Sequence, residues 1–269
     1  MWALVKVIGP GFPYVELAFF RALLAMPLMG TLLWRSGHRV RPARPLLMVA
    51  RGLLGVGAML GMFFALPRGK FADFAIIGKT QPLLIAMLSQ ALIREPPPRV
   101  ALLSLALGFA GALLVIKPGF GLLNVAALVV LGAAALSALA HLAVRRLNAT
   151  DPPLLIVFHF TLVVGVVSGA LSLPVFVAPD LRQWGMLIAV AQLAAAGQLL
   201  MTTAYGRDAA PVVAAASYAS VIYALVLGFA FWGELPDGLA LLGGILIVGA
   251  GLLLARGRRG VRQPPAPPS

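Results

Sequence analysis

Residues 153–175 read PLLIVFHFTLVVGVVSGALSLPV, an apolar run without a charged side chain. A helix crosses the hydrocarbon core of a bilayer with about 20 mostly apolar residues, and in lipid its backbone N–H and C=O groups must be hydrogen-bonded internally. The run is continuously apolar, whereas the strands of a membrane barrel alternate between apolar and polar residues. Residues 153–175 therefore predict a transmembrane helix.

The same pattern recurs along the chain. Of its 269 residues, 61% are hydrophobic and 11% are charged, and the mean hydropathy is +0.99. Soluble proteins have about 25% charged residues. Short joints rich in proline, glycine and charge, such as REPPP at 94–98, separate the apolar runs. We therefore expect an all-α polytopic membrane protein with apolar segments at 13–34, 45–66, 71–93, 99–116, 122–144, 153–175, 184–205, 210–232 and 236–255.

The basic residues predict the orientation of these segments, because cytoplasmic loops carry an excess of Lys and Arg. When the loop at 35–44 is placed in the cytoplasm, the basic loop residues left outside are Arg68, Lys70, Lys117 and Arg182. The inside then holds Arg35, Arg39, Arg41, Arg44, Arg94, Arg99, Arg145, Arg146, Arg207, Arg256, Arg258, Arg259 and Arg262. This distribution predicts a multi-pass protein with a cytoplasmic C-terminus, whose basic, proline-rich tail at 256–269 rests on anionic headgroups.

An internal repeat is visible when the chain is aligned with itself at an offset of 139 residues. The halves then align without a gap from residue 3 to 95, and Arg68 and Glu95 fall on Arg207 and Glu234. Each half holds five helices, an odd number, so the second half must be inverted relative to the first. Inverted repeats are a recurring architecture of secondary transporters. We expect one repeat at 1–116 and an inverted one at 122–255.

The repeat predicts that the first helix of the first half is incomplete. The helix at 122–144 has its counterpart in residues 1–9, which at 1.5 Å per residue cover only about 14 Å. We interpret Met1 as an internal methionine of a longer chain that has ten helices. The alternative is a protein with nine spans and a re-entrant N-terminus.

Six stretches are similar to the EamA-type transporters of the drug/metabolite transporter superfamily. They are ELAFFRALLAMPL (16–28), RGLLGVGAMLGMFFAL (51–66), KTQPLLIAMLSQALIRE (79–95), GFAGALLVIKP (108–118), SYASVIYALVLGFAFWGELPD (217–237) and GGILIVGAGLLLA (243–255). The resemblance implies a bacterial ten-helix carrier of the cytoplasmic (inner) membrane, built from two five-helix repeats. It also implies secondary active transport of small metabolites, often outward.

Three cations fall inside apolar segments, where a Lys or Arg costs about 2.5–3.5 kcal/mol and usually faces a cavity or a partner. Arg21 and Lys79 lie about 12 Å into their helices, near the bilayer midplane, and Arg51 lies closer to the cytoplasmic side. The second half has uncharged residues at the aligned positions, namely Phe160, Val190 and Tyr218. This asymmetry is expected when a site is specialised for one ligand.

The candidate substrate site combines these cations with nearby polar groups. Pro82 cannot donate a hydrogen bond to the Gly78 carbonyl, which interrupts the helix beside Lys79. The aligned turn of the second half carries hydroxyls that form a second wall. The candidate residues are Lys79, Arg21, Gln81, Tyr218, Ser217, Ser220, Tyr223 and Arg51. The alternatives are that Arg21 pairs with backbone carbonyls and that the hydroxyls bond to their own helix.

Coupling to a proton or another ion has three candidate residues, Glu16, Asp73 and His159. A histidine titrates near physiological pH and is suited to a proton relay, and His159 aligns with Phe20, beside Arg21. We expect a structural role for His141 and a role as cap or loop anchor for Glu95. No metal site and no cofactor are expected, because no carboxylates stand at ligand spacing and cysteine is absent.

These observations favour a secondary transporter of a small metabolite with an anionic group, such as an amino acid or an organic acid, and an exporter in particular. The chain has no G-x-x-x-x-G-K-[ST] cradle for ATP phosphates. It also lacks H-E-x-x-H and G-x-S-x-G, so we do not expect an enzyme. A lipid-moving protein or a carrier of lipophilic drugs is the alternative within the same fold, and an intramembrane enzyme is the alternative outside it. The net charge of +13 reflects topology, and no nucleic-acid partner is expected.

Overall fold

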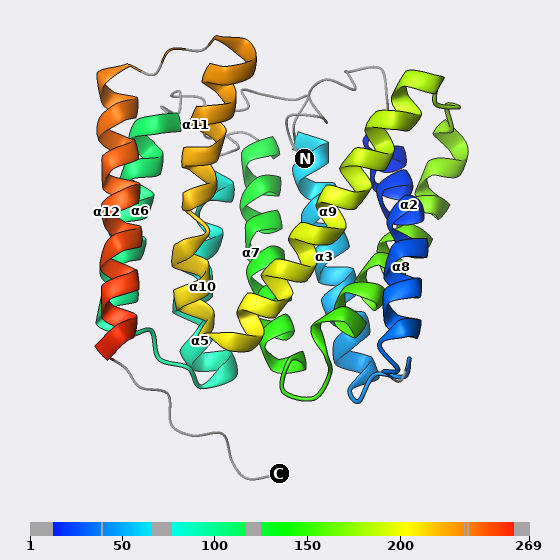
Figure 1. Cartoon of the computed structure of the whole chain (residues 1–269), viewed down its shortest axis with the longest axis horizontal. Coiled ribbons are helices and arrows are strands. Elements are labelled where there is room, and N and C mark those ends of the chain that lie inside the picture. The colour runs from blue at the N-terminus through cyan, green and yellow to red at the C-terminus, as the bar shows by residue number, and fades with distance from the viewer. Residues whose placement is uncertain are drawn as a thin grey trace.

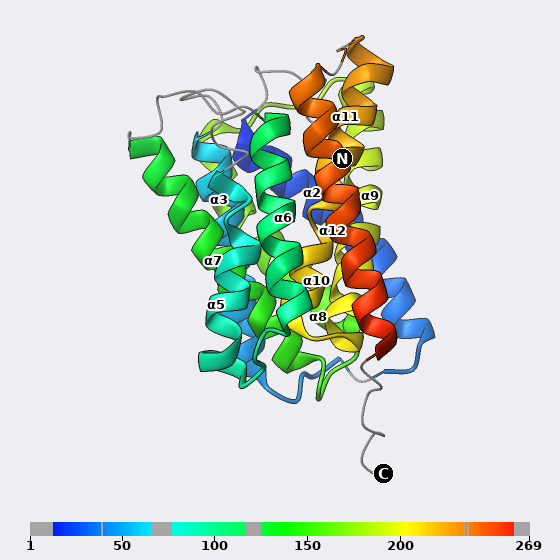
Figure 2. The same cartoon turned by 90° about the vertical axis from the view of Figure 1, so that its left-hand side faces the viewer.

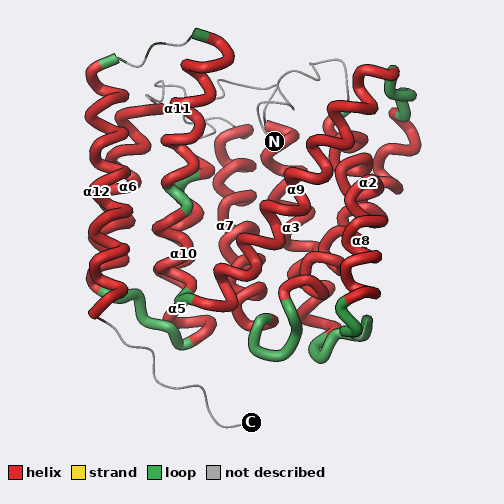
Figure 3. Tube along the Cα trace, viewed as in Figure 1, coloured by secondary structure: helices red, strands yellow, loops and turns green. Residues whose placement is uncertain are grey.

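The structure, a computed structural model, describes residues 13–38, 40–65, 77–116, 125–233, 235 and 237–260. Every regular element in these ranges is a helix (Figures 1 and 3). The helices are α2 (Tyr14–Arg35), α3 (Pro45–Ala65), α5 (Gln81–Ile93), α6 (Arg99–Ile116), α7 (Val125–Leu147), α8 (Pro153–Ser172) with the 3₁₀ turn η2 (Leu173–Val175), α9 (Leu181–Arg207), α10 (Ala210–Ala216), α11 (Ala219–Trp232) and α12 (Gly238–Gly260). Within the described residues, 7 helices are long and apolar enough to cross a membrane. The predicted all-α polytopic fold is confirmed.

Two of the predicted helices are interrupted. The expected continuous helix at 210–232 is wrong, because the chain leaves α10 at Ala216, turns through Ser217 and Tyr218, and re-enters the helical conformation as α11. Figure 3 shows this break as a loop between α10 and α11. In the segment 71–93, the described part turns at Lys79 and Thr80 before α5 begins. The two breaks lie at positions that the predicted repeat aligns with each other.

The helices pack in two groups. The most extensive pairings are α3 with α7, α6 with α12, and α2 with α8. Helices α2, α3, α7, α8 and α9 form one group, and α5, α6, α10, α11 and α12 form the other (Figures 1 and 2). The principal contacts between the groups come from α5 and α10, which both pack on α7, whereas α11 packs mainly on α12 and α6.

The contact between α6 and α12 depends on two glycines. A Cβ atom added to Gly111 would lie 2.6 Å from the carbonyl oxygen of Gly243, and one added to Gly243 would lie 2.5 Å from the carbonyl oxygen of Gly111. The two backbones therefore approach more closely than any other residue would permit. Small residues at such crossings are a common means of helix association in membranes, where packing replaces the hydrophobic effect as the driving force.

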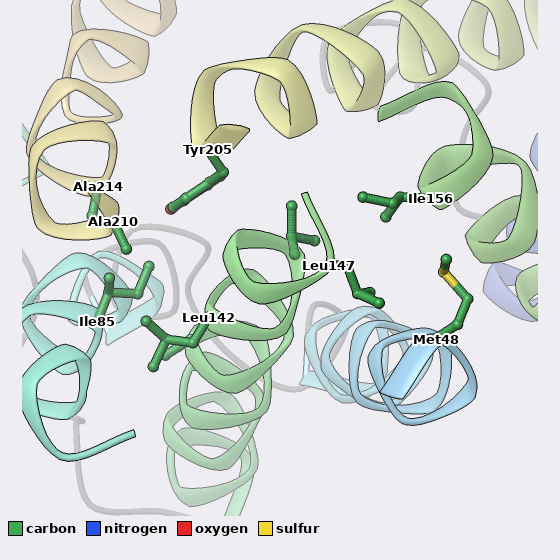
Figure 4. Close-up of a cluster of buried hydrophobic side chains, with 10 residues drawn as sticks. Met48, Ile85, Leu142, Leu147, Ile156, Tyr205, Ala210 and Ala214 are labelled. Atoms are coloured by element: carbon green, nitrogen blue, oxygen red, sulfur yellow. The ribbon is translucent and has the colours of Figure 1, made fainter. Parts of the chain in front are cut away.

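The end of the bundle that carries the loops 36–44, 94–98 and 148–152, which we call the arginine-rich end, is closed by an apolar cluster (Figure 4). Its members come from six helices of both groups, and the labelled ones are Met48, Ile85, Leu142, Leu147, Ile156, Tyr205, Ala210 and Ala214. The loops are also tied together, since the backbone N–H of Ala43 donates to Asp151 at 2.8 Å. The positive-inside rule predicts that this end faces the cytoplasm.

Candidate transport site

The break before α5 exposes backbone carbonyls that side chains then satisfy. Thr80 Oγ1 donates to the carbonyl of Ile77 at 2.6 Å, and the Tyr218 hydroxyl donates to the carbonyl of Lys79 at 2.9 Å. Pro82 stands in the first turn of α5, where its missing N–H leaves no helical hydrogen bond to lose. The bond from Tyr218 joins the first break to the second one, on the opposite half of the chain.

The break between α10 and α11 is held by serine hydroxyls. Ser217 Oγ donates to the carbonyl of Ala214 at 2.7 Å, and Ser220 Oγ donates to the carbonyl of Ser217 at 2.7 Å. Both bonds tighten the chain locally, as hydroxyls near a helix terminus do. Ser220 Oγ in turn accepts a hydrogen bond of 2.6 Å from Lys79 Nζ. The two helix breaks therefore meet through a Lys–Ser contact and a Tyr–carbonyl contact.

The residues with hydroxyl groups at the break and in α11 have different environments. Ser220 and Tyr223 are three residues apart in α11, which places them on one side of the helix, the side that Lys79 contacts. The Tyr223 side chain is 69% exposed. Tyr218 points elsewhere: it is buried, and a Cβ atom added to Gly108 on α6 would lie 2.7 Å from its ring. Tyr218 thus packs against α6 on the buried side of the two helix breaks. Lys79, Ser220 and Tyr223 place their polar groups on the accessible side.

Gln81 reaches a polar group that we assigned a structural role from the sequence. Its Nε2 lies 3.0 Å from Nδ1 of His141, on α7. That histidine also lies 2.6 Å from the carbonyl oxygen of Ser137 and 2.9 Å from the sulfur of Met201. His141 therefore connects the Lys79 segment to α9. The sequence showed His141 as a single histidine in an apolar helix. It could not predict the residues of other helices that contact His141.

Arg21 and Arg51 lie in a different part of the molecule, between α2, α3, α8 and α9. Arg51 is buried, donates through Nη2 to Gln198 Oε1 at 3.3 Å, and places its guanidinium carbon 3.7 Å from the centre of the Phe160 ring. No hydrogen bond in the described part of the chain joins either arginine to Lys79. The eight candidate binding residues therefore form two separate sets. One set lies where the two broken helices meet, around Lys79, and the other consists of Arg21 and Arg51.

Among the described residues, the coupling candidates Glu16 and His159 make no hydrogen bond with either cluster. Glu16, fully buried in the first turn of α2, accepts a 2.7 Å hydrogen bond from the Val177 backbone on Oε1, and its Oε2 has no hydrogen-bond partner among the described residues. His159 Nδ1 lies 3.0 Å from the carbonyl oxygen of Leu155 in its own helix. Asp73 lies outside the described residues.

An ion pair reinforces the arginine-rich end. Arg145 Nε donates to Glu95 Oε1 at 2.7 Å, and Arg145 Nη1 donates to the carbonyl of Tyr205 at 3.0 Å. Glu95 Oε2 accepts the backbone N–H of Ala210, at the start of α10, at 3.1 Å. Glu95 thereby ties the end of α5 to α7 and to the α9–α10 junction, which are parts of both halves of the chain.

A groove of about 480 Å³ runs between α11 and α12. All of its lining residues are apolar, and they are Ile222, Val226, Phe229, Ala240, Leu241, Gly244, Ile245 and Val248. Leu241 and Ile245 belong to the large apolar side chains that the bundle exposes on its outside. Such a surface is suited to contact with lipid acyl chains.

A helical membrane bundle whose two interrupted helices meet at polar groups is the architecture of a membrane transporter. The chain belongs to the EamA-like transporter family, whose profile matches residues 1–117 and 124–256. The pseudopaline exporter CntI of Pseudomonas aeruginosa (strain UCBPP-PA14) is 33% identical over 263 residues, which are 97% of this chain and 92% of the relative. A riboflavin transporter of Brucella anthropi is 26% identical over 91% of this chain and 89% of the relative. A crystal structure of a protein with 20% identity superimposes with a TM-score of 0.81 over 96% of this chain and 92% of that chain. The protein is therefore a transporter and not an enzyme.

Proposed function

We propose that the chain is a secondary active exporter of a small metabolite that carries an anionic group, of the amino-acid or organic-acid type. The observation that carries this proposal is the contact of 2.6 Å between Lys79 Nζ and Ser220 Oγ, made where two broken helices meet. Similarity to an exporter over 97% of the chain supports the direction of transport. The substrate would bind beside this contact, with Tyr223 on the same side of α11.

The charge of Lys79 is the reason to expect an anion. An ammonium group removed from water is costly unless it is paired, and the contact that the described residues give Lys79 Nζ is a neutral hydroxyl. A carboxylate or phosphate that replaced the hydroxyl would form a charge-assisted hydrogen bond, which is roughly twice as strong as a neutral one. Lys79 thus gains more from an anionic ligand than from Ser220.

The arrangement of the halves suits alternating access. The apolar cluster and the Glu95–Arg145 ion pair hold the halves together at the arginine-rich end. Within the described part of the chain, α11 packs mainly on α12 and α6. The substrate site between these regions would be reached from the end opposite to the arginine-rich one. Glu16, with its buried carboxylate, and His159 are the described groups that could bind a coupling proton.

A lipid-moving function receives less support. A flippase must carry a polar headgroup, and the groove between α11 and α12 that would face the lipid is lined only by apolar residues. A charged or polar headgroup would find no hydrogen-bond partner there, at a cost of several kcal/mol. The groove can accommodate an acyl chain, but its lining offers no polar route for a lipid headgroup.

The proposal is tested by ligand-induced thermal stabilisation of the purified protein in detergent, with L-glutamate, L-lysine and citrate as probes. We expect an acidic probe to stabilise the wild type and to lose this effect in Lys79→Met, which keeps a flexible chain of similar length. Lys79→Arg should restore it only in part, because a guanidinium is larger and planar. The control is Arg99→Met, which removes an exposed cation at the arginine-rich end.

The melting temperature of each variant without a probe shows whether it is folded. Probes that bind to folded Lys79→Met as well as to the wild type would contradict the role of Lys79. Export is measured by uptake of the stabilising probe into inverted vesicles, and an absence of uptake would contradict the exporter assignment.

A further inference from the structure

The cluster around Arg51 holds more positive charge than its described neighbours balance. Arg51 is 3% exposed, and its Nε and Nη1 are buried atoms without a hydrogen-bond partner. The face of Phe160 and the Oε1 of Gln198 are the groups that stabilise its guanidinium. A ring face attracts a cation, but it is a much weaker hydrogen-bond acceptor than an oxygen atom. Arg51 therefore brings a charge and two free donors into the interior.

Arg21 brings a second charge to the same region. It lies on α2 and lines a small pocket together with Thr161 on α8 and Gln198 on α9. Arg21 makes no ion pair or hydrogen bond with another described residue. Both arginines lie next to Gln198, because Arg21 lines the same pocket as Gln198 and Arg51 donates to it. No carboxylate in the described part of the chain pairs with either of them.

Gln198 accepts a hydrogen bond from Arg51 and lines the same pocket as Arg21. Because Arg51 donates to Oε1, the other end of the amide, Nε2, can only donate. Thr161 lines the pocket beside it, with its hydroxyl proton committed to the carbonyl of Val157 at 2.9 Å. The pocket is thus bordered by the donors of Arg21 and Gln198, with the charge of Arg51 behind the amide. This is an environment for an anion.

The remaining lining decides the size of that anion. Apart from Arg21, Thr161 and Gln198, the pocket is lined by small or apolar residues, namely Ala22, Ala25, Val164, Ala191, Ala194 and Ala195. The space between them is about 10 Å³, which is close to the room that one small ion or one water molecule needs. A carboxylate with its carbon skeleton would have to displace α2, α8 or α9, which pack closely on one another.

We propose that Arg21, Gln198 and Arg51 form a buried site for a monatomic anion, chloride in the cell, separate from the substrate joint at Lys79. The bound halide accepts from Arg21 and from Gln198 Nε2 and offsets the charge of both arginines. Its role is to let two cations remain inside the bundle that α2, α3, α8 and α9 form. This site does not depend on the identity of the transported metabolite.

The test measures binding of radioactive chloride to the full chain purified in detergent, in a buffer whose other anion is gluconate. We expect saturable binding by the wild type, reduced about tenfold or more in Arg21→Met and in Gln198→Leu, because each loses a charge-assisted bond. Bromide should displace the label, whereas acetate and formate should not. Lys79→Met and Arg99→Met are matched controls and should bind chloride as the wild type does.

Three results would overturn the proposal: no saturable chloride binding, binding that is unchanged in folded Arg21→Met and Gln198→Leu, or displacement by acetate more effective than by bromide. The last result would assign the site to a carboxylate. Chloride binding that persists in Lys79→Met supports the halide site whatever becomes of the substrate proposal, so the two can fail separately.

Discussion

Substitution of Gly111 by alanine tests whether the close crossing of α6 and α12 stabilises the fold. The added Cβ would lie 2.6 Å from the carbonyl oxygen of Gly243 and 2.8 Å from a side-chain carbon of Ile247. Ordinary contacts begin near 3.4 Å, so the helices must separate by about 0.8 Å at this point. Overpacking of this kind costs roughly 1–3 kcal/mol, which exceeds the gain of about 0.5–1 kcal/mol that alanine brings to a helix.

The measurement is thermal unfolding of the purified protein in detergent. The net loss is roughly 0.5–2 kcal/mol. At 2–4 °C per kcal/mol, a scale taken from soluble proteins of similar size, Gly111→Ala should lower Tm by roughly 1–8 °C. The matched control is Gly249→Ala in the same helix α12, where an added Cβ meets nothing within 4 Å. It should leave Tm unchanged or raise it slightly.

A double mutant sharpens this test. Gly243→Ala alone should behave like Gly111→Ala, because its Cβ would lie 2.5 Å from the opposite carbonyl. Once one substitution has separated the helices, the second finds part of its space already open, so the combined loss should be smaller than the sum. If Gly111→Ala is as harmless as Gly249→Ala, the two backbones do not approach as described, and the packing argument is wrong.

Two further predictions concern the arginine-rich end. Arg94 has φ 57, a left-handed conformation that costs a residue with a side chain about 1–2 kcal/mol. Arg94→Gly should therefore raise Tm, whereas Arg94→Ala, which removes the charge but keeps the strain, should not. Glu95→Gln should weaken the contact with Arg145 and open this end. Because the chain has no cysteine, a single Ser89→Cys at a fully buried position can report the opening, and its maleimide labelling in inverted vesicles should rise several-fold. Unchanged labelling would show that the ion pair does not close the bundle.

The helices were largely predictable because lipid imposes a simple rule on the sequence. The predicted segment 99–116 coincides with α6, and 153–175 coincides with α8 and η2. Helix α9 begins three residues before the predicted 184, because Asp180 and Gln183 form a capping box with bonds of 2.7 and 2.8 Å. That D-x-x-Q signature was present in the sequence. A continuous apolar run sets a length, whereas capping residues set the actual ends.

The break between α10 and α11 was not predictable from its own segment. Residues 210–232 contain no charged side chain, and Pro211 falls in the first turn of α10, where a helix tolerates it. The Tyr218 bond to the Lys79 carbonyl comes from a helix far away in the chain. The break near Lys79 was easier to find, because Pro82 removes a backbone donor locally.

The candidate site was predictable in composition but not in arrangement. Hydropathy predicts that Lys79, Arg21 and Arg51 are within the membrane, because each of them lies inside a long apolar run. Which of them meet depends on the order in which the helices pack, and that order brings Ser220 to Lys79 and Gln198 to Arg51. A single sequence contains no direct record of such neighbours.

The division of one membrane span into α10 and α11 has a mechanical consequence. At 1.5 Å per residue, the two pieces measure about 10 and 21 Å, and only α10 is embedded in the apolar cluster of the arginine-rich end. At the break, the backbone N–H groups of Ser217 and Tyr218 bond to carbonyls three residues back, as in a 3₁₀ turn. A short 3₁₀ stretch inside a helix is a common hinge position. Helix α11 can therefore change its angle relative to α10, and the hinge consists of Ser217 and Tyr218. Lys79 binds Ser220 just after this hinge. A molecule that replaces the Lys79–Ser220 hydrogen bond therefore also changes the angle between α10 and α11.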